Sequence, residues 1–251
     1  MSDERGLSFN RLAGVKNLKK RIIFLPVVLL FVLLPTLFAQ DIPVNEYGLQ
    51  VVDSPELYQE LVRQDSTRRL VDLEKFIPRI HLDIRYATND NFMGKQLYTV
   101  PGAYLRLPAA TALKSVQADL KSLNLGLKVY DGYRPYRVTV MMWEPYQDSR
   151  YVADPASGSR HNRGCAVDVS LVSLKTGEEL PMPTGYDDFS EKAHHSYSDL
   201  PDEVLKNRYV LRSIMEKHGF VPISSEWWHY DYQGWKRYYL MDISLTHLAG
   251  E

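Results

Sequence analysis

The feature that most limits the fold is the stretch CAVDVSLVSL (residues 165–174), whose side chains alternate as they do along a β-strand. Cys165, Val167 and Val169 would lie on one face of that strand, and Asp168 on the other. A strand with one apolar face needs a sheet whose apolar side is covered by another layer. The carboxylate of Asp168 is then expected to point away from the core.

Helical and strand-like periods interleave along the rest of the chain. Helices are expected over 54–64, 108–124 and 202–219, and strands over 79–88, 125–129 and 224–232. The repeated βαβ rhythm of a doubly wound sheet is absent, and so is a Gly-rich phosphate loop. We therefore expect one α+β domain, with a mainly antiparallel sheet flanked by helices. The single cysteine, Cys165, excludes an internal disulfide, so the core must hold this domain together.

The N-terminal segment differs from the remainder. A stretch rich in Lys and Arg precedes the apolar run Ile22–Phe38, and a small residue, Ala39, follows it. This order is typical of a cleaved secretory signal peptide. The alternative is an uncleaved membrane anchor, but the run contains two prolines and is shorter than the roughly 20 apolar residues that span a membrane comfortably. Residues 1–39 are thus predicted to direct export to the periplasm, and residues 40–251 to form the functional domain.

Charge excludes one class of partner. The chain has 30 Lys and Arg against 31 Asp and Glu, and the N-terminal segment holds more basic than acidic residues, so the remainder is net acidic. Nucleic-acid binding needs a basic face, and we expect none here. Contact with a membrane is expected only through an uncleaved N-terminal segment.

Four polar residues suggest a metal site. Zinc binds histidine nitrogen and carboxylate oxygen, and a catalytic zinc keeps three protein ligands beside a water. A further carboxylate commonly serves as the general base. His161, Asp168, His229 and Glu226 provide these groups. His161 can fold back over the Asp168 face because a Gly-containing turn separates them.

The spacing of Glu226 and His229 leaves their geometry open. Three residues apart, they would share a face on a helix but point to opposite faces on a regular strand. The neighbouring proline and aromatic residues favour a strand with a bend or bulge that brings both to one cavity. Taken separately, each residue has an ordinary alternative: His161 as a surface loop residue, and Asp168 as a solvated or capping carboxylate.

Together the motifs resemble a known family. SRHNRGCAVDVSL (159–171) and EWWHY (226–230) are similar to the two metal-site motifs of the D-alanyl-D-alanine dipeptidases (VanX-like, peptidase family M15), zinc D,D-peptidases related to the hedgehog fold. The pattern is S-x-H-x-x-G-x-A-x-D followed by E-x-W-H. YATNDNFMGK (86–95) and DGYRP (131–135) agree as well. The resemblance runs from about residue 78 to 232.

The resemblance implies a role for each matching residue. One Zn²⁺ per chain would be held by His161, Asp168 and His229. Glu226 would take a proton from the attacking water and pass it to the leaving amine. Arg134 would stabilise the oxyanion, as an always-charged guanidinium can. In addition, Tyr86 and Ser159 would line the site and contact the dipeptide.

The implied activity is zinc-dependent hydrolysis of D-Ala-D-Ala to D-alanine in the cell envelope. Two alternatives stay open. The first is a D,D-carboxypeptidase or a peptidoglycan endopeptidase on the same fold. The second is a non-catalytic binding module that keeps zinc for structure, although such a module needs neither Glu226 nor Arg134. An exported enzyme would not meet the cytoplasmic dipeptide pool, which favours scavenging or wall turnover over antibiotic resistance.

Overall fold

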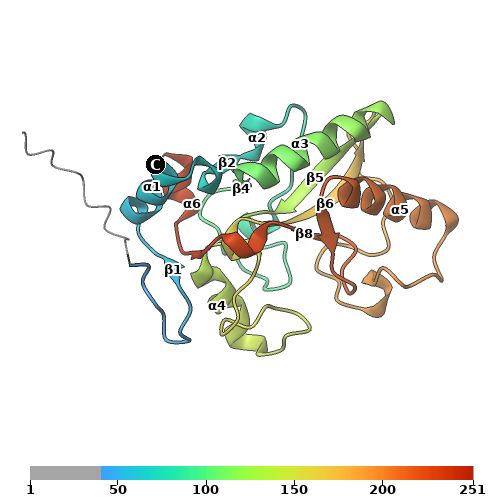
Figure 1. The fold of residues 1–251 in the computed structure, drawn as a ribbon. Coiled ribbons are helices and arrows are strands. Elements are labelled where there is room, and N and C mark those ends of the chain that lie inside the picture. Colours follow the sequence, from blue (N-terminus) through green and yellow to red (C-terminus); the bar gives the residue numbers. More distant parts are fainter. Residues whose placement is uncertain (1–40, 251) are drawn as a thin grey trace, which may run out of the picture. The chain divides into compact units, whose positions relative to one another are not determined.

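A five-stranded sheet forms the centre of the protein, in the order β3-β5-β6-β8-β7 (Figure 1). The computed structural model describes residues 41–250. The parallel pair is β3 with β5, and the other three pairings in this sheet are antiparallel. Its strands are β3 (His81–Leu82), β5 (Leu125–Asp131), β6 (Ala166–Ser173), β7 (Phe220–Pro222) and β8 (His229–Tyr232).

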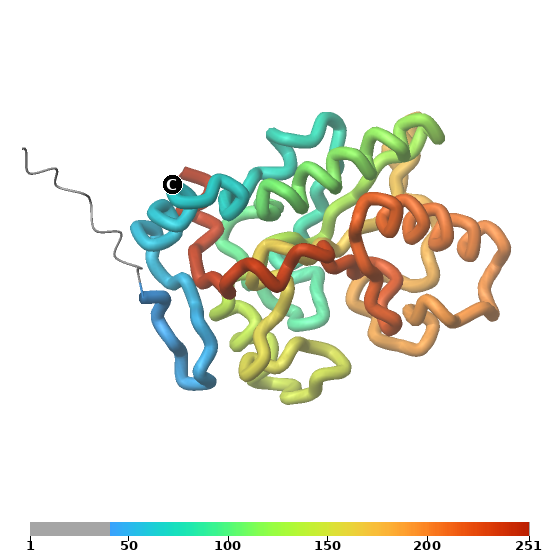
Figure 2. Tube along the Cα trace, in the orientation of Figure 1, coloured from blue at the N-terminus to red at the C-terminus, as the bar shows by residue number. Residues whose placement is uncertain are grey.

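Two short ribbons lie beside this sheet. β1 (Val51–Val52) pairs in parallel with β9 (Leu240–Met241), so the first and last described segments lie side by side (Figure 2). β2 (Leu70–Asp72) pairs antiparallel with β4 (Tyr104–Arg106). The helices are α1 (Pro55–Gln64), α2 (Leu73–Phe76), α3 (Leu107–Ser122), α4 (Tyr136–Tyr146), α5 (Asp202–Lys217) and α6 (Leu245–Ala249).

Helices α3 and α5 cover one face of the central sheet (Figure 1). The apolar stripe of α3, which includes Leu113 and Val116, is fully buried in the same core as Val167 and Val169 of β6. Burying such side chains contributes about 1.5–3 kcal/mol each. This packing fixes β6 in place, and with it the opposite face, which carries Asp168.

The predicted fold class is confirmed: an α+β domain with a mainly antiparallel sheet flanked by helices. The three predicted helices also form, within a few residues of the expected bounds. The strand expected over 79–88 is wrong beyond its first part. Only His81–Leu82 pairs with β5, and a 3₁₀ turn, Arg85–Ala87, follows. Ion pairs from Arg85 to Asp83 and Asp90 stabilise this turn, which carries Tyr86 into the interior.

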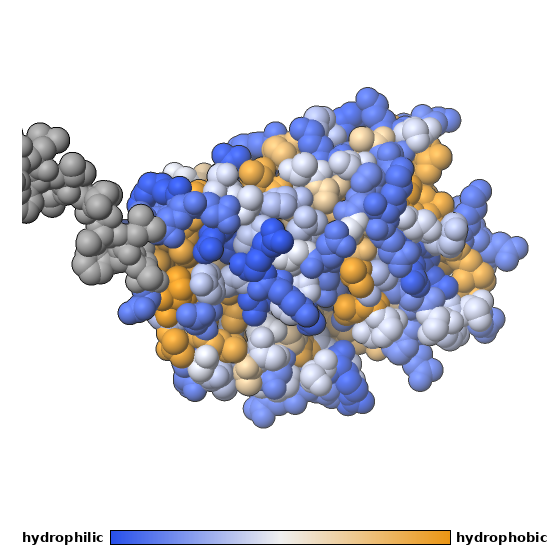
Figure 3. Space-filling model, in the orientation of Figure 1, coloured by the Kyte–Doolittle hydropathy of each residue, from blue (hydrophilic) through white to orange (hydrophobic). Residues whose placement is uncertain are grey.

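The predicted signal peptide or anchor, residues 1–39, lies outside the described residues. Within 41–250, none of the helices has the length and apolarity needed to cross a membrane. On the face that Figure 3 shows, hydrophobic atoms form small groups scattered among hydrophilic ones. That is the ordinary composition of a solvated protein surface.

Candidate active site

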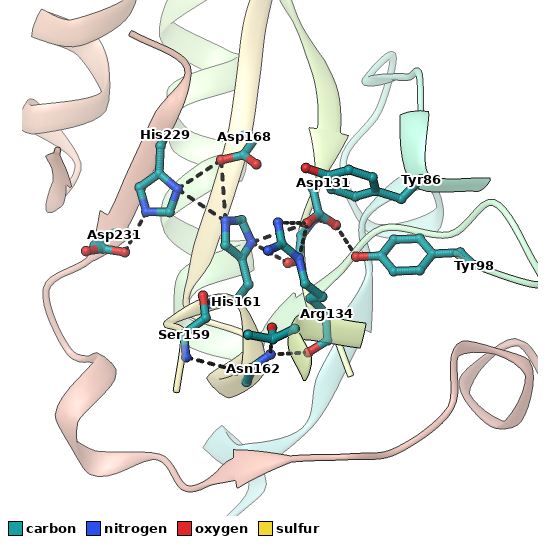
Figure 4. Close-up of polar contacts among 12 residues, drawn as sticks. Tyr86, Tyr98, Asp131, Arg134, Ser159, His161, Asn162, Asp168, His229 and Asp231 are labelled. Carbon is teal, nitrogen blue, oxygen red and sulfur yellow. Dashed lines mark hydrogen bonds and ion pairs between the residues drawn. The ribbon is translucent and has the colours of Figure 1, made fainter. Parts of the chain in front are cut away.

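Strand pairing brings two of the predicted ligands together. Asp168 of β6 lies directly opposite His229, the first residue of β8. His161 opens a 3₁₀ turn that ends at Gly164, where φ is +68°. A Cβ at Gly164 would come within 2.6 Å of a Leu70 methyl carbon, so this tight return needs glycine. The turn folds His161 back over the polar face of β6, as the sequence predicted (Figure 4).

Three ligand atoms form a nearly equilateral triangle. His161 Nε2 lies 3.2 Å from His229 Nδ1 and 3.4 Å from Asp168 Oδ1, and the His229 Nδ1 to Asp168 Oδ1 distance is 3.0 Å. Four ligands around a zinc ion at 2.0–2.1 Å would be separated by about 3.3 Å along each edge of the tetrahedron. The triangle therefore has the size of one face of a zinc site.

The second nitrogen of each histidine ring, which points away from the triangle, shows why the three triangle atoms need a cation. His161 Nδ1 lies 2.7 Å from the carbonyl oxygen of Gly132, and His229 Nε2 lies 3.0 Å from Asp231 Oδ1. Both partners are acceptors, so in a neutral ring, which is the form that binds a metal, these nitrogens carry the proton. The other nitrogens, His161 Nε2 and His229 Nδ1, then carry lone pairs that face Asp168 Oδ1. Asp168 Oδ1 is buried and has no hydrogen-bond partner. This set of ligand atoms fits a divalent metal. The carbonyl of Gly132 and the carboxylate of Asp231 hold the two histidine rings in the orientation that a metal needs.

Electrostatics support the same interpretation. Burial would lower the pKa of His229, but the carboxylates of Asp168 and Asp231 beside the ring outweigh this effect and raise that pKa to about 10. Burial would raise the pKa of Asp168, yet the rings of His161 and His229 beside it hold that pKa well below its usual value. The pocket thus favours positive charge at its centre, which a metal cation would provide.

The side chain of Asp168 leaves the apolar face of β6, as predicted. It is only 3% exposed, which excludes the alternative of a solvated carboxylate. Residues of the loop between β6 and α5 cover this side of the strand, and Tyr186 from that loop contacts the carboxylate. Both faces of β6 are therefore buried, one against the core and one beneath the site.

Glu226 lies beside the triangle, in the turn before β8. Its Oε2 is 4.0 Å from His229 Nδ1, and the side chain is largely buried. The bend predicted for this segment is confirmed at Trp227 and Trp228, whereas the strand expected over 224–232 forms only from His229 onward. Burial raises the pKa of Glu226, and the charge of Asp168 adds to this against the opposing effect of His229. A carboxylate with a raised pKa at the edge of a metal site is suited to general-base chemistry.

Arg134 enters the site from the chain segment after β5. Its Nε and Nη2 donate to Asp131 Oδ2 at 3.0 and 2.7 Å, and its guanidinium lies over the ring of Tyr86. Burial would lower the pKa of Arg134, but the charge of Asp131 raises it well above its usual value. A permanent, fixed cation therefore lines the cavity.

The cavity itself has a volume of about 600 Å³, and every predicted site residue lines it. Its wall includes Tyr86, which is 2% exposed and donates to Asp187 Oδ1 at 3.1 Å. Ser159 Oγ accepts from the backbone N–H of His161 at 3.2 Å and so supports the turn that carries a ligand. The structure thus brings together all seven residues singled out from the sequence.

Sequence reasoning missed several residues of this site. Asp131 and Asp231 orient Arg134 and His229. A signal for Asp231 existed, because it lies two residues after His229 and so on the same face of its strand. Tyr186 and Asp187 come from the loop between β6 and α5, in which no periodicity pointed to a site. Burial and the charge of Asp168 raise the pKa of Asp187 well above its usual value. Its Oδ2 is buried without a hydrogen-bond partner.

Comparisons with known proteins show which family this chain resembles in sequence. The sequence model of the D-ala-D-ala dipeptidase family (peptidase M15) matches residues 66–244. The D-alanyl-D-alanine dipeptidase of Escherichia coli is 38% identical over 66% of this chain and 85% of its own length. That of Enterococcus faecium is 33% identical over 63% of this chain and 88% of its own. A solved LD-carboxypeptidase, LdcB, has a TM-score of 0.40 at 21% identity over 67% of this chain and 69% of its own, a likeness that carries no conclusion about function.

Proposed function

Because this chain belongs to the D-ala-D-ala dipeptidase family of M15 peptidases, we propose that it hydrolyses D-Ala-D-Ala with the help of one zinc ion. The observation that carries the proposal is the triangle of His161, Asp168 and His229 beside Glu226. Zinc ligands in a catalytic site leave one position open for water or substrate. Three protein ligands and an adjacent carboxylate match that arrangement, whereas a structural site needs four ligands and no base.

Each residue has a defined part in the reaction. Zinc, when bound, supplies Lewis acidity that polarises the scissile carbonyl and acidifies the attacking water. Glu226 accepts the proton of that water and delivers it to the nitrogen of the leaving D-alanine, since its raised pKa suits both steps. Arg134, which lines the cavity, offers its guanidinium to the carbonyl oxygen as negative charge develops there. Asp131 and the ring of Tyr86 hold the guanidinium in place for this task.

The cavity also favours a short substrate with a free amino group. Asp187 lines the cavity, and one of its oxygens accepts from Tyr86 while the other has no hydrogen-bond partner, so we assign this carboxyl to the substrate ammonium. The ammonium would supply the charge that this buried carboxyl needs in order to ionise. Ser159 lies on the cavity wall and retains its hydroxyl proton for a substrate oxygen. A longer stem peptide has no free ammonium next to its scissile bond, so a dipeptidase is favoured over a D,D-carboxypeptidase or an endopeptidase.

The deciding experiment offers the zinc-loaded protein D-Ala-D-Ala, L-Ala-L-Ala and a stem pentapeptide in parallel. We expect release of D-alanine from the D,D-dipeptide alone. Cleavage of the pentapeptide alone would overturn the dipeptidase assignment in favour of wall trimming. Zinc binding without any hydrolysis would support the non-catalytic module.

Two variants test the mechanism. Glu226→Gln should retain zinc and lose about 10²- to 10⁴-fold in kcat, the range for loss of a general base. Glu216→Gln is the matched control, because this residue lies on α5 and pairs with Arg212 on the surface. Equal activity of Glu226→Gln and Glu216→Gln would refute the assigned base.

We further propose that the enzyme acts outside the cytoplasm, in the periplasm. The support is the basic and apolar N-terminal segment that ends at Ala39. N-terminal sequencing of the protein recovered from the cell envelope should begin after Ala39. A protein that starts at Met1 and fractionates with membranes would instead support the uncleaved anchor.

A further inference from the structure

The loop between β6 and α5 contributes a hydroxyl to the metal centre. Tyr186 OH donates to Asp168 Oδ2 at 2.8 Å, whereas Asp168 Oδ1 faces the two histidines and has no hydrogen bond. The two oxygens of this carboxylate therefore have different environments. One is tied to a phenol, and the other is presented to the centre of the triangle.

The ring of Tyr186 is held so that this hydroxyl cannot swing away. It stacks on the ring of Tyr130, with centroids 4.4 Å apart and planes inclined by 14°. The edge of Trp228 packs against it at 5.6 Å, and the ring of Tyr86 lies 6.0 Å away. Tyr130 is itself fixed, because its hydroxyl donates to Glu179. Such aromatic contacts contribute about 0.5–1.5 kcal/mol each beyond their buried area.

The backbone conformation at Asp187 also stabilises the contact between Tyr186 and Asp168. Asp187, the next residue, has φ of +63°, a left-handed conformation that few residues other than glycine adopt. Asparagine and aspartate tolerate it best, because their short polar side chains hydrogen-bond locally. This single left-handed residue lets Tyr186 reach Asp168 while Asp187 itself reaches Tyr86 OH.

With Tyr186 included, each of the three ligand side chains has its own orienting contact. His161 is held by the carbonyl of Gly132, His229 by Asp231, and Asp168 by Tyr186. Outer contacts of this kind fix the geometry of a ligand, and their removal costs typically 10- to 100-fold in metal affinity. A hydrogen bond to Oδ2 also withdraws that oxygen from a metal at the triangle, so the carboxylate binds through Oδ1 alone.

We propose that Tyr186 is a positioning residue that holds Asp168 in a monodentate orientation and thereby sets the zinc affinity and coordination number of the site. This inference rests on the proposed function, because it takes the triangle to be a zinc site. Tyr186 acts through Asp168 and makes no contact with the reacting atoms.

The test compares Tyr186→Phe with Tyr130→Phe. Both remove one hydroxyl from rings that stack on each other, but the hydroxyl of Tyr130 donates to Glu179, away from the ligands. The zinc dissociation constant of the chelator-treated full-length protein is measured by competition with a chromophoric chelator. X-ray absorption at the zinc edge then reports the number of oxygen neighbours, and a thermal melt confirms that each variant is folded.

Tyr186→Phe should weaken zinc binding about 10- to 100-fold and add an oxygen neighbour, because Oδ2 is released to bind as well. Tyr130→Phe should keep both properties of the unmodified protein. Unchanged affinity and oxygen count in Tyr186→Phe would overturn the inference, and so would equal losses in both variants. Failure of the unmodified protein to bind zinc would overturn the zinc site itself. Zinc binding without dipeptide hydrolysis would instead refute the proposed function and leave the comparison of the two variants decisive.

Discussion

The buried pair of Asp131 and Arg134 offers the sharpest test of how the site is built. Asp131 is 1% exposed and accepts from Arg134 Nε and Nη2, from Tyr98 OH at 2.7 Å and from the backbone N–H of Gly132 at 2.9 Å. Asp131→Asn keeps the shape of the side chain but removes its charge. The guanidinium of Arg134, which is 8% exposed, would then be a buried cation without a counter-ion.

Breaking a buried ion pair by removal of one partner costs about 3–5 kcal/mol of unfolding free energy. Because whole domains are stable by only about 5–15 kcal/mol, Asp131→Asn should shift urea denaturation strongly. Asp242→Asn is the control, since it breaks an arginine pair whose partner, Arg137, is largely exposed. We expect a smaller loss there, because solvent screens the pair.

The double variant Asp131→Asn with Arg134→Met removes both charges. It should lose less stability than the sum of the single variants, since no uncompensated charge remains, with a coupling of about 0.5–3 kcal/mol. Urea denaturation of the four proteins measures this coupling directly. A loss below about 1 kcal/mol for Asp131→Asn, or strictly additive losses, would refute the view that these two residues form one electrostatic unit.

Three further predictions concern activity and reactivity. Burial raises the pKa of Glu226 above its usual 4.5. Because the base must be ionised, kcat/KM should fall as the pH drops through that raised pKa, and an acidic limb at or below pH 4.5 would contradict this. Asp187→Asn should raise KM for the dipeptide far more than it lowers kcat, because its carboxylate is assigned to the substrate ammonium; an unchanged KM would exclude that contact. Cys165 is fully buried, and burial raises its pKa to about 12. A thiol reagent should therefore modify Cys165 only after denaturation, and rapid labelling of the native protein would show that this segment opens.

The placement of Asp168 and His161 could be predicted from the sequence by local rules, whereas their role as ligands was implied by the family resemblance. Alternation along β6 fixes the face of Asp168, and the glycine turn limits where His161 can lie. The same rules explain the failure at 79–88, where alternation suggested a full strand. Only His81 and Leu82 pair there. Arg85 then forms ion pairs with Asp83 and Asp90, and the chain turns at this point.

The contribution of the loop between β6 and α5 could not be predicted in the same way. Tyr186 and Asp187 reach the site through aromatic stacking and one left-handed residue, and neither leaves a periodic signal in the sequence. Asp131 lies in a motif that was recognised, yet its role depends on burial and on four simultaneous donors. Such roles are set by tertiary packing, which local patterns do not encode.

The most direct test of the central claim is a zinc titration of the chelator-treated protein, followed by release of D-alanine from D-Ala-D-Ala. If His161, Asp168 and His229 hold one catalytic zinc, activity should rise linearly and break at one zinc per chain. Activity that survives complete removal of metal, or that stays absent at every zinc concentration, would contradict the account.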